Sequence, residues 1–363
     1  LPMELGNLLE LEYLVLGTNG FTGTIPSSLG QLLQLESLDL SFTALSGSIP
    51  TELCELSSLY SLTLNNAALS GSIPGSLGGL TSVLLLDLSY NQLTGRIPSS
   101  IGQLTVLHDV DLSYNVLTSS LPVSLSQLLQ LQSLILSANQ LTGPLLNVTA
   151  LPELFQLVAS DNRFTGTLPY NIGTATAITS LNLTNNNLHG SLPTGLGQLY
   201  SLEVLSLSGN HFTGSLPPSL SALSNLYDLD VSRNALTGPL TQVFNASIQV
   251  LLSTVVLGNN SFTGSLPDSL FHLPSIVGVS IFSTCLAGIL PESVCNSGST
   301  MQYLTLNGLH TAASCRRTVW SSAISKAYTI STAFSGTVPP CVYTMPYLSS
   351  LQLSGNSLTG SLP

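Results

Sequence analysis

Charged residues are scarce in this chain of 363 residues. Lys and Arg together number 6, with Lys326 the single Lys, whereas Asp and Glu number 17, so the formal net charge is −11. Globular proteins normally carry about a quarter charged residues. The shortage of basic residues excludes a nucleic-acid-binding surface, because phosphate contacts need a basic patch. It also disfavours docking on an anionic membrane.

Long apolar runs and catalytic groupings are missing as well. No run of about 18 apolar residues occurs, although the mean hydropathy is +0.43, so we expect no membrane span in this segment. The absence of a CxxC pair or His cluster disfavours a zinc site. The five His residues occur singly, and no glycine loop has the spacing of a phosphate site. We therefore predict neither an enzyme nor a cofactor.

A repeat runs through the whole chain. The pattern LxxLxLxxNxL begins at fifteen positions, mostly 24 residues apart: 11, 35, 59, 83, 107, 131, 154, 178, 202, 226, 252, 276, 301, 324 and 348. The alternating Leu residues predict a short strand with one buried face. Stacked coils would join these strands into a parallel sheet.

An Asn follows the strand in most repeats. A column of Asn side chains predicts a hydrogen-bonded ladder inside the coils, because a buried amide without partners is destabilising. The turn after it contains Gly, as in Leu93-Thr94-Gly95, and Ile97-Pro98 then begins the return path. The ladder residues are Asn19, Asn91, Asn115, Asn139, Asn162, Asn186, Asn210, Asn234, Asn260 and Asn356.

The segment LTGxIPxxLGxL, seen at residues 93–104 and 212–223, resembles the plant-specific class of leucine-rich repeats. That class forms the ectodomains of receptor-like kinases and receptor-like proteins, and polygalacturonase-inhibiting proteins. The resemblance implies a mostly β solenoid of α/β type, a right-handed superhelix. It would have a concave parallel sheet, short second strands and 3-10 or helical convex segments. It covers the whole chain.

The chain is expected to be one solenoid, residues 1–363, of about 15 repeats. Solenoids need polar end caps, and neither end shows one, so the sequence is interpreted as a fragment. The repeats at Met301 and Ile324 lack the Asn, with Leu309 and Thr332 in its place. Because their spacing is kept, residues 301–347 are predicted to be two degenerate coils, with no inserted island.

Residues between the buried Leu positions would face solvent on the concave sheet. In coils two to five they predict an acidic surface with an aromatic rim, suited to a basic or amphipathic partner. The alternative is that these residues are ordinary for a solvated strand. Calcium among the aspartates would need six or more oxygen ligands, which disfavours it. The candidate residues are Asp39, Phe42, Asp87, Tyr90, His108, Asp109, Asp111 and Tyr114.

Arg316, Arg317 and Trp320 form a second candidate surface in the degenerate coils, since Trp and Arg are frequent at interface hot spots. Sequence divergence of a degenerate repeat, with Trp320 filling a packing gap, explains these residues equally well. Four N-x-[ST] sequons predict N-glycosylation at two or more positions. They are at Asn147, Asn182, Asn245 and Asn259.

Four of the five cysteines cluster near the degenerate coils, at Cys285, Cys295, Cys315 and Cys341. An oxidising compartment would favour disulfides there. Three complete pairings are open, and Cys295 with Cys315 or Cys315 with Cys341 lie closest to one coil apart. Cys54 is expected to be a buried free thiol.

The leading hypothesis is an extracellular or cell-surface recognition module, disulfide-bonded and glycosylated, that binds a protein, peptide or glycan. The rival is a structural or adhesive glycoprotein of a matrix, wall or filament, favoured by the scarcity of basic residues and a Ser- and Thr-rich surface. A polygalacturonase inhibitor ranks third, because that family has a shorter array. Lateral self-association stays open.

Overall fold

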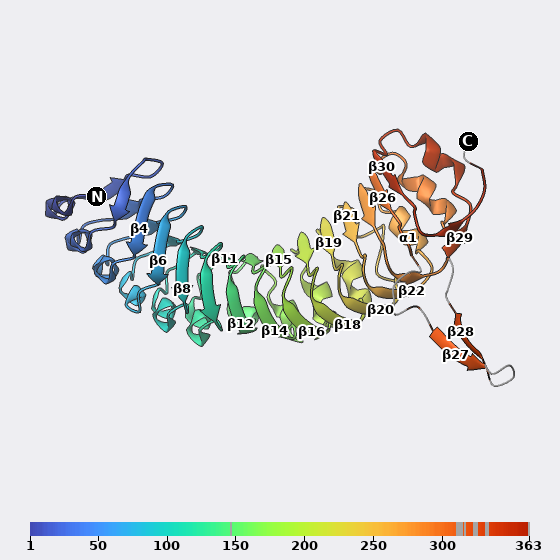
Figure 1. Ribbon diagram of the computed structural model, residues 1–363, viewed down its shortest axis with the longest axis horizontal. Coiled ribbons are helices and arrows are strands. Elements are labelled where there is room, and N and C mark those ends of the chain that lie inside the picture. Colours follow the sequence, from blue (N-terminus) through green and yellow to red (C-terminus); the bar gives the residue numbers. More distant parts are fainter. Residues whose placement is uncertain (146, 310–314, 316, 322–325, 331–333, 362–363) are drawn as a thin grey trace. The chain divides into compact units, whose positions relative to one another are not determined.

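In the computed structural model, the described residues are 1–145, 147–309, 315, 317–321, 326–330 and 334–361. They form two compact units. Unit 1 is Leu1–Gly166 with Ser180–Asn187, and unit 2 is Thr167–Thr179 with Leu188–Pro363. Within each unit, a typical coil contributes one strand to a first sheet, one strand to a second sheet and a short helical segment (Figure 1). The expected mostly β leucine-rich repeat solenoid fold is therefore confirmed.

The first sheet of unit 1 is parallel, and its strands pair in the register of the repeat. Leu14 lies opposite Leu38, and Leu38 lies opposite Leu62. These central leucines are buried while the residues on either side are more exposed, as alternation along a strand requires. The strands are β1 (Tyr13–Val15), β3 (Ser37–Asp39), β5 (Ser61–Thr63), β7 (Leu85–Asp87), β9 (Asp109–Asp111), β11 (Ser133–Ile135), β13 (Gln156–Val158) and β15 (Ser180–Asn182).

The second sheet and the 3-10 segments complete the coils of unit 1. Gly95 ends its strand with a φ of +76°, where a side chain would be strained. The second-sheet strands are β2 (Thr22–Thr24), β4 (Ala44–Ser48), β6 (Ala68–Ser72), β8 (Gln92–Gly95), β10 (Val116–Ser119), β12 (Gln140–Pro144) and β14 (Arg163–Gly166). The 3-10 segments are η1 (Met3–Asn7), η2 (Ser27–Gln31), η3 (Thr51–Glu55), η4 (Leu77–Gly79), η5 (Ser99–Gln103), η6 (Val123–Gln127) and η7 (Val148–Ala150).

Unit 2 is built in the same way, with an additional short sheet. Its first-sheet strands are β17 (Val204–Ser206), β19 (Asp228–Asp230), β21 (Thr254–Val256), β23 (Gly278–Ser280), β26 (Tyr303–Thr305) and β30 (Ser350–Gln352). The other parallel strands are β16 (Asn187–Ser191), β18 (His211–Ser215), β20 (Ala235–Pro239), β22 (Ser261–Gly264), β24 (Cys285–Leu286), β25 (Gly288–Ile289), β29 (Phe334–Gly336) and β31 (Ser357–Leu358). The helical segments are η8 (Ile172–Thr174), η9 (Thr194–Gln198), η10 (Pro218–Ala222), α1 (Asp268–Phe271), η11 (Glu292–Ser297) and η13 (Pro340–Thr344).

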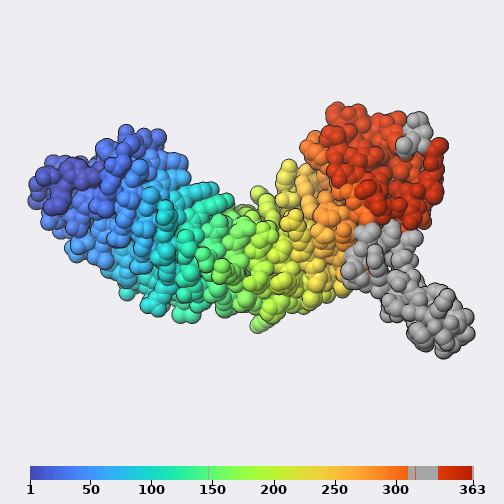
Figure 2. Space-filling view, viewed as in Figure 1, coloured from blue at the N-terminus to red at the C-terminus, as the bar shows by residue number. Residues whose placement is uncertain are grey.

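The interior of each coil is filled by the repeat leucines and a ladder of asparagines. Asn139 shows the pattern: its Nδ2 donates to the carbonyls of Leu112, Leu136 and Ser137, and its Oδ1 accepts from the N–H of Leu117. One side chain therefore ties its own coil to the preceding one. The predicted ladder is confirmed. In the space-filling view, successive coils of a unit follow one another in chain order (Figure 2).

Close stacking on the helical side depends on small residues. A Cβ placed at Gly30 would overlap the carbonyl of Glu52 in the next coil. Cys54 lies in the same column and is a buried free thiol, as expected.

Residues 301–347 differ from the expected pair of degenerate coils. Strand β26 pairs directly with β30, with Leu304 opposite Leu351. The residues between them include an antiparallel hairpin of β27 (Arg317–Ser321) and β28 (Lys326–Ile330), which is a separate two-stranded sheet (Figure 1). The repeat expected at Ile324 therefore adds no strand to the first sheet, and the chain does carry an insertion there. The 24-residue spacing concealed it, because the insertion is about as long as one coil.

Two disulfides lie around this insertion. Cys285 bonds Cys315, and Cys295 bonds Cys341. All four clustered cysteines are thus oxidised as predicted, but neither of the pairings judged closest is formed. The prediction assumed that Cys295, Cys315 and Cys341 lie on successive coils. That assumption is wrong because the hairpin stands between β26 and β30 in the sequence and adds no coil. Within the described ranges, no helix is long and apolar enough to cross a membrane.

Candidate functional site

The candidate site is the solvent-exposed face of the first sheet in unit 1, here called the sheet face. Its charged residues are all acidic in the stretch from β3 to β9. The arginines of unit 1 are elsewhere: Arg96 follows the second-sheet strand β8, and Arg163 begins β14. Among the described residues, the sheet face therefore has no Lys or Arg side chain to neutralise its carboxylates.

Asp87 and Asp111 are directly opposite each other on β7 and β9. The Oδ1 atom of Asp87 accepts hydrogen bonds from the backbone N–H and the hydroxyl of Ser89, at 2.9 and 2.7 Å. Burial raises the pKa of Asp87, the Ser89 hydrogen bonds oppose that rise, and the charge of Asp111 adds to it. Asp109 lies on the same strand as Asp111, so three carboxylates are gathered on two neighbouring strands.

The aromatic residues follow the strands at a backbone position with positive φ. Phe42, Tyr90 and Tyr114 have φ angles of 52°, 53° and 52°. The rings of Tyr90 and Tyr114 stack with their centroids 4.2 Å apart and an angle of 11° between their planes. Desolvation and the neighbouring Tyr114 raise the pKa of Tyr90. The stack is an aromatic platform about half exposed, beside the carboxylates of Asp87 and Asp111.

The structure brings five of the eight candidates into a compact group, and Asp39, Phe42 and His108 are outside it. Asp87, Tyr90, Asp109, Asp111 and Tyr114 come together on two coils. Thr63 lies between Asp39 and Asp87 in the sheet register, and Asn66 is the positive-φ residue between Phe42 and Tyr90. His108 is half-buried just before β9, and its backbone N–H donates to Leu84.

Sequence reasoning found His108 but missed its two exposed neighbours in the same row, Tyr60 and Leu84. Tyr60, Leu84 and His108 follow one another across three coils, linked by backbone hydrogen bonds from Leu84 to Tyr60 and from His108 to Leu84. Tyr60 and Leu84 are 39% and 37% exposed. Counting the second position of LxxLxL would have found this row. It adds an apolar strip beside the carboxylates.

Tyr13 and Glu36 form a further contact that sequence reasoning missed. The Tyr13 hydroxyl donates to Glu36 Oε2 at 2.7 Å. That bond and the charge of Glu36 raise the pKa of Tyr13 to about 12. In unit 2, Asp228 and Asp230 repeat the paired carboxylates on β19, next to the exposed Tyr227.

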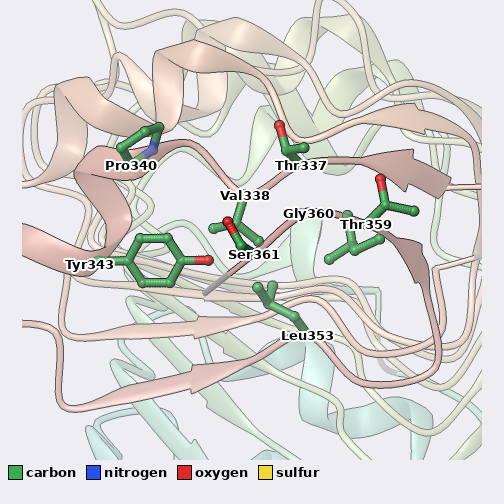
Figure 3. Close-up of a pocket in the computed structure, with 9 residues that line it drawn as sticks. Thr337, Val338, Pro340, Tyr343, Leu353, Thr359, Gly360 and Ser361 are labelled. Carbon is green, nitrogen blue, oxygen red and sulfur yellow. The ribbon is translucent and has the colours of Figure 1, made fainter. Parts of the chain in front are cut away.

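Several cavities are away from the sheet face, along the turns that contain Ile, Leu or Val followed by Pro. One of about 570 Å³ lies between the segments after β29 and β31, where Val338, Leu353 and Tyr343 line it (Figure 3). Others of about 410 and 570 Å³ lie at Ile73 and at Ile25. Because they recur at one repeat position, they are features of the coil geometry.

The remaining predicted residues are placed as follows. Arg316 lies outside the described residues, and Arg317 and Trp320 belong to β27, where only the backbone is described. Among the sequons, Asn147 and Asn259 are exposed, whereas Asn182 and Asn245 are half-buried. Over the part of the chain that the structure describes, no group of three or more His, Cys, Asp or Glu is arranged to hold a metal.

Comparisons with known proteins agree with this geometry. The Leucine Rich Repeat model matches residues 10–32, 34–56, 82–104, 177–199, 201–223 and 251–273. No curated protein sequence matches the chain. The chain is similar to the ectodomain of the Arabidopsis receptor kinase HAESA in complex with an extended IDA peptide hormone. Identity is 30% and the TM-score 0.63, over 100% of this chain and 69% of that one.

Two other solved structures show how widely the fold is shared. A TDR receptor has 26% identity and a TM-score of 0.79, over 100% of this chain and 63% of its own. A leucine-rich repeat protein of Leptospira interrogans has 27% identity and a TM-score of 0.65, over 99% and 88%. The chain spans between 49% and 69% of the length of the plant receptor ectodomains that it matches. The chain belongs to the leucine-rich repeat family and is similar to the ectodomains of plant receptor kinases.

Proposed function

We propose that this chain is a non-catalytic, extracellular recognition module that binds a basic peptide or protein segment on the sheet face of unit 1. The observation that carries the proposal is the grouping of Asp87, Asp109 and Asp111 beside the stacked Tyr90 and Tyr114. Cationic side chains would meet the carboxylates, while aromatic or aliphatic side chains would contact the tyrosine platform.

Two further points support the proposal. Similar receptor structures are described as complexes with peptide hormones, among them the HAESA and RGFR1 ectodomains. The disulfides of unit 2 are typical of proteins that fold in an oxidising compartment. Since the recognition surface is an open strand face with no catalytic grouping, binding alone is the activity expected of it.

A peptide-binding experiment tests this proposal. The secreted protein is screened against synthetic 12-residue peptides in basic, neutral and acidic sets of equal apolar content, and hits are measured by calorimetry. We expect the basic set to bind, and the D87N/D111N variant to weaken binding about threefold to tenfold, as for charge pairs near a surface. The Y90A/Y114A variant should also weaken it.

The matched control is E52Q/E55Q, which removes two carboxylates from η3, outside the sheet face. This variant should bind like the wild type. Equal binding of the acidic and basic sets, or equal losses in the control and in D87N/D111N, would contradict the proposal. Because burial raises the pKa of Asp87, binding should weaken as the pH falls through that pKa and the carboxylate is neutralised.

A structural or adhesive role is the second candidate, and one observation favours it. The second sheet of unit 1 presents short hydroxyl side chains in coil after coil, and several donate to the glycine carbonyl of the preceding coil, as Ser46 and Thr94 do. Such a flank offers a regular and nearly uncharged surface for lateral association. Sedimentation at increasing protein concentration distinguishes the candidates, since a structural protein should form larger species and a recognition module should stay at one size.

A further inference from the structure

The coil that begins at Leu131 is one residue short, and the loss falls in its 3-10 segment. In the short coil, the repeat positions of Leu121, Val123 and the buried Leu125 are taken by Leu145, Asn147 and the buried Val148. The short coil therefore lacks a residue equivalent to Ser124. The Ser124 hydroxyl donates to the Ser99 carbonyl at 2.6 Å and ties η6 to the coil before it. The short coil has no such hydroxyl at this place.

A cavity of about 300 Å³ lies beside the short coil, at the same repeat position as the cavities near Ile73 and Ile25. Val123 at its edge is 89% exposed, so its apolar surface is open to an occupant of the cavity. Among the described residues, the walls contain no ionisable side chain and are mostly apolar. They are formed by Leu121, Pro122, Val123, Ser126, Pro144, Leu145, Asn147 and Ala150.

Asn147 is both a wall of this cavity and the acceptor of a sequon. It is exposed and directly precedes η7, and the Thr149 hydroxyl donates to its Oδ1 at 2.8 Å. That bond engages Oδ1 of Asn147, so Nδ2, the atom to which a glycan is attached, takes no part in it. The other sequons differ: Asn182 and Asn245 are half-buried with Oδ1 accepting a backbone N–H, and Asn259 has a φ of 54°.

We infer that Asn147 carries an N-glycan whose first N-acetylglucosamine lies in this cavity and covers Val123 and Leu145. The sugar is suited to the place because its acetamido methyl and C–H face are apolar, while its hydroxyls stay in water. Burying the valine and leucine surface stabilises the short coil. The occupant is tethered to the wall, so its local concentration is high without any affinity for free sugar.

The modification joins Nδ2 of Asn147 to C1 of the sugar. The C1–O bond of a polyprenyl-diphosphate oligosaccharide donor breaks, the diphosphate leaves with the electron pair, and the Nδ2 proton passes to a base of the transferase. This inference rests on the secretory location in the proposed function. It does not depend on ligand binding, since the sheet-face variants leave the sequon unchanged.

The test uses protein secreted from a eukaryotic host. One sample is trimmed with an endoglycosidase that leaves a single N-acetylglucosamine, and N147Q supplies the protein without sugar at this position. We expect trimmed and intact protein to have the same Tm, and N147Q to melt about 2–4 °C lower, the shift for about 1 kcal/mol in a unit of this size. Hydrogen exchange at residues 123–127 should be faster in N147Q.

Two controls make the outcome specific. N259Q removes a sequon that the cavity does not include, and its Tm should match the wild type. In V123S, which takes away the apolar wall, loss of the Asn147 glycan should no longer lower the Tm. Glycopeptide mass spectrometry that finds Asn147 unmodified would overturn the inference. So would equal Tm shifts in N147Q and N259Q, or a trimmed sample as unstable as N147Q.

Discussion

At the scale of single residues, the ladder asparagines hold the fold together more than their small size suggests. From Asn91 onward each joins backbone groups of two neighbouring coils, and seven of the ten are buried. The residue directly before a ladder asparagine has a positive φ and can carry a large side chain, as Tyr90 and Tyr114 do. Structural and surface roles therefore occupy adjacent positions in the repeat.

Replacing one buried ladder residue should be costly. In N139A, the N–H of Leu117 loses its partner, while the carbonyls of Leu112, Leu136 and Ser137 each lose one of two donors. A buried polar group without a partner costs about 1–3 kcal/mol, so we expect a Tm about 2–12 °C lower, at about 2–4 °C per kcal/mol. Asn19 is exposed, and N19A is the control that should change little. Equal shifts in both variants would contradict the role of burial.

The Tyr13 and Glu36 pair predicts a pH effect. The pKa of Tyr13 is raised from 10.0 to about 12, so the pair stabilises the fold fully below pH 10 and loses that contribution as the pH rises through 12. Tyrosinate absorbance measured against pH should show a late-titrating group that is absent in Y13F. In E36Q the same group should titrate near its ordinary value. An unchanged titration in E36Q would show that Glu36 is not the cause.

At the scale of elements, the sequence predicts the regular parts and fails at the irregular one. The first-sheet strands, the second strands and the ladder follow from the spacing of Leu and Asn, since the same contacts recur in every coil. The hairpin β27–β28 could not be predicted, because its length imitates one coil and antiparallel pairing has no signature in LxxLxL spacing. The disulfide pairing depends on that hairpin and was therefore open. In the candidate site, register predicted the carboxylates, but the stacking of Tyr90 on Tyr114 needed side-chain geometry.

The disulfide pairing can be checked by peptide mapping without reduction. We expect cross-linked peptides containing Cys285 with Cys315 and Cys295 with Cys341. Loops of 30 and 46 residues are closed, for which chain entropy gives about 4 kcal/mol each. The C295S/C341S variant should therefore lower the Tm of unit 2 markedly, whereas C54A should not. Finding Cys295 bonded to Cys315 would contradict the structure.

At the scale of the whole molecule, stability is a sum of coils and their nearest-neighbour contacts. A defect should therefore spread locally within a unit. In L134A, a cavity at the centre of β11 removes about 2–5 kcal/mol, because Leu134 is fully buried. Hydrogen exchange should accelerate most in β9, β11 and β13 and least in β1. Uniform acceleration across unit 1 would show instead that the unit unfolds as one cooperative block.

The pairing of β26 with β30 has a practical consequence. These strands meet in register although 44 residues separate them, twice the 22 between β23 and β26. Foreign sequence can therefore enter the array between two coils while the sheet stays continuous on either side. The hairpin is therefore a suitable insertion site, where a circularly permuted fluorescent protein could replace residues 317–330. Such a fusion would report on the coils beside it and would leave every residue of the acidic face of unit 1 unchanged.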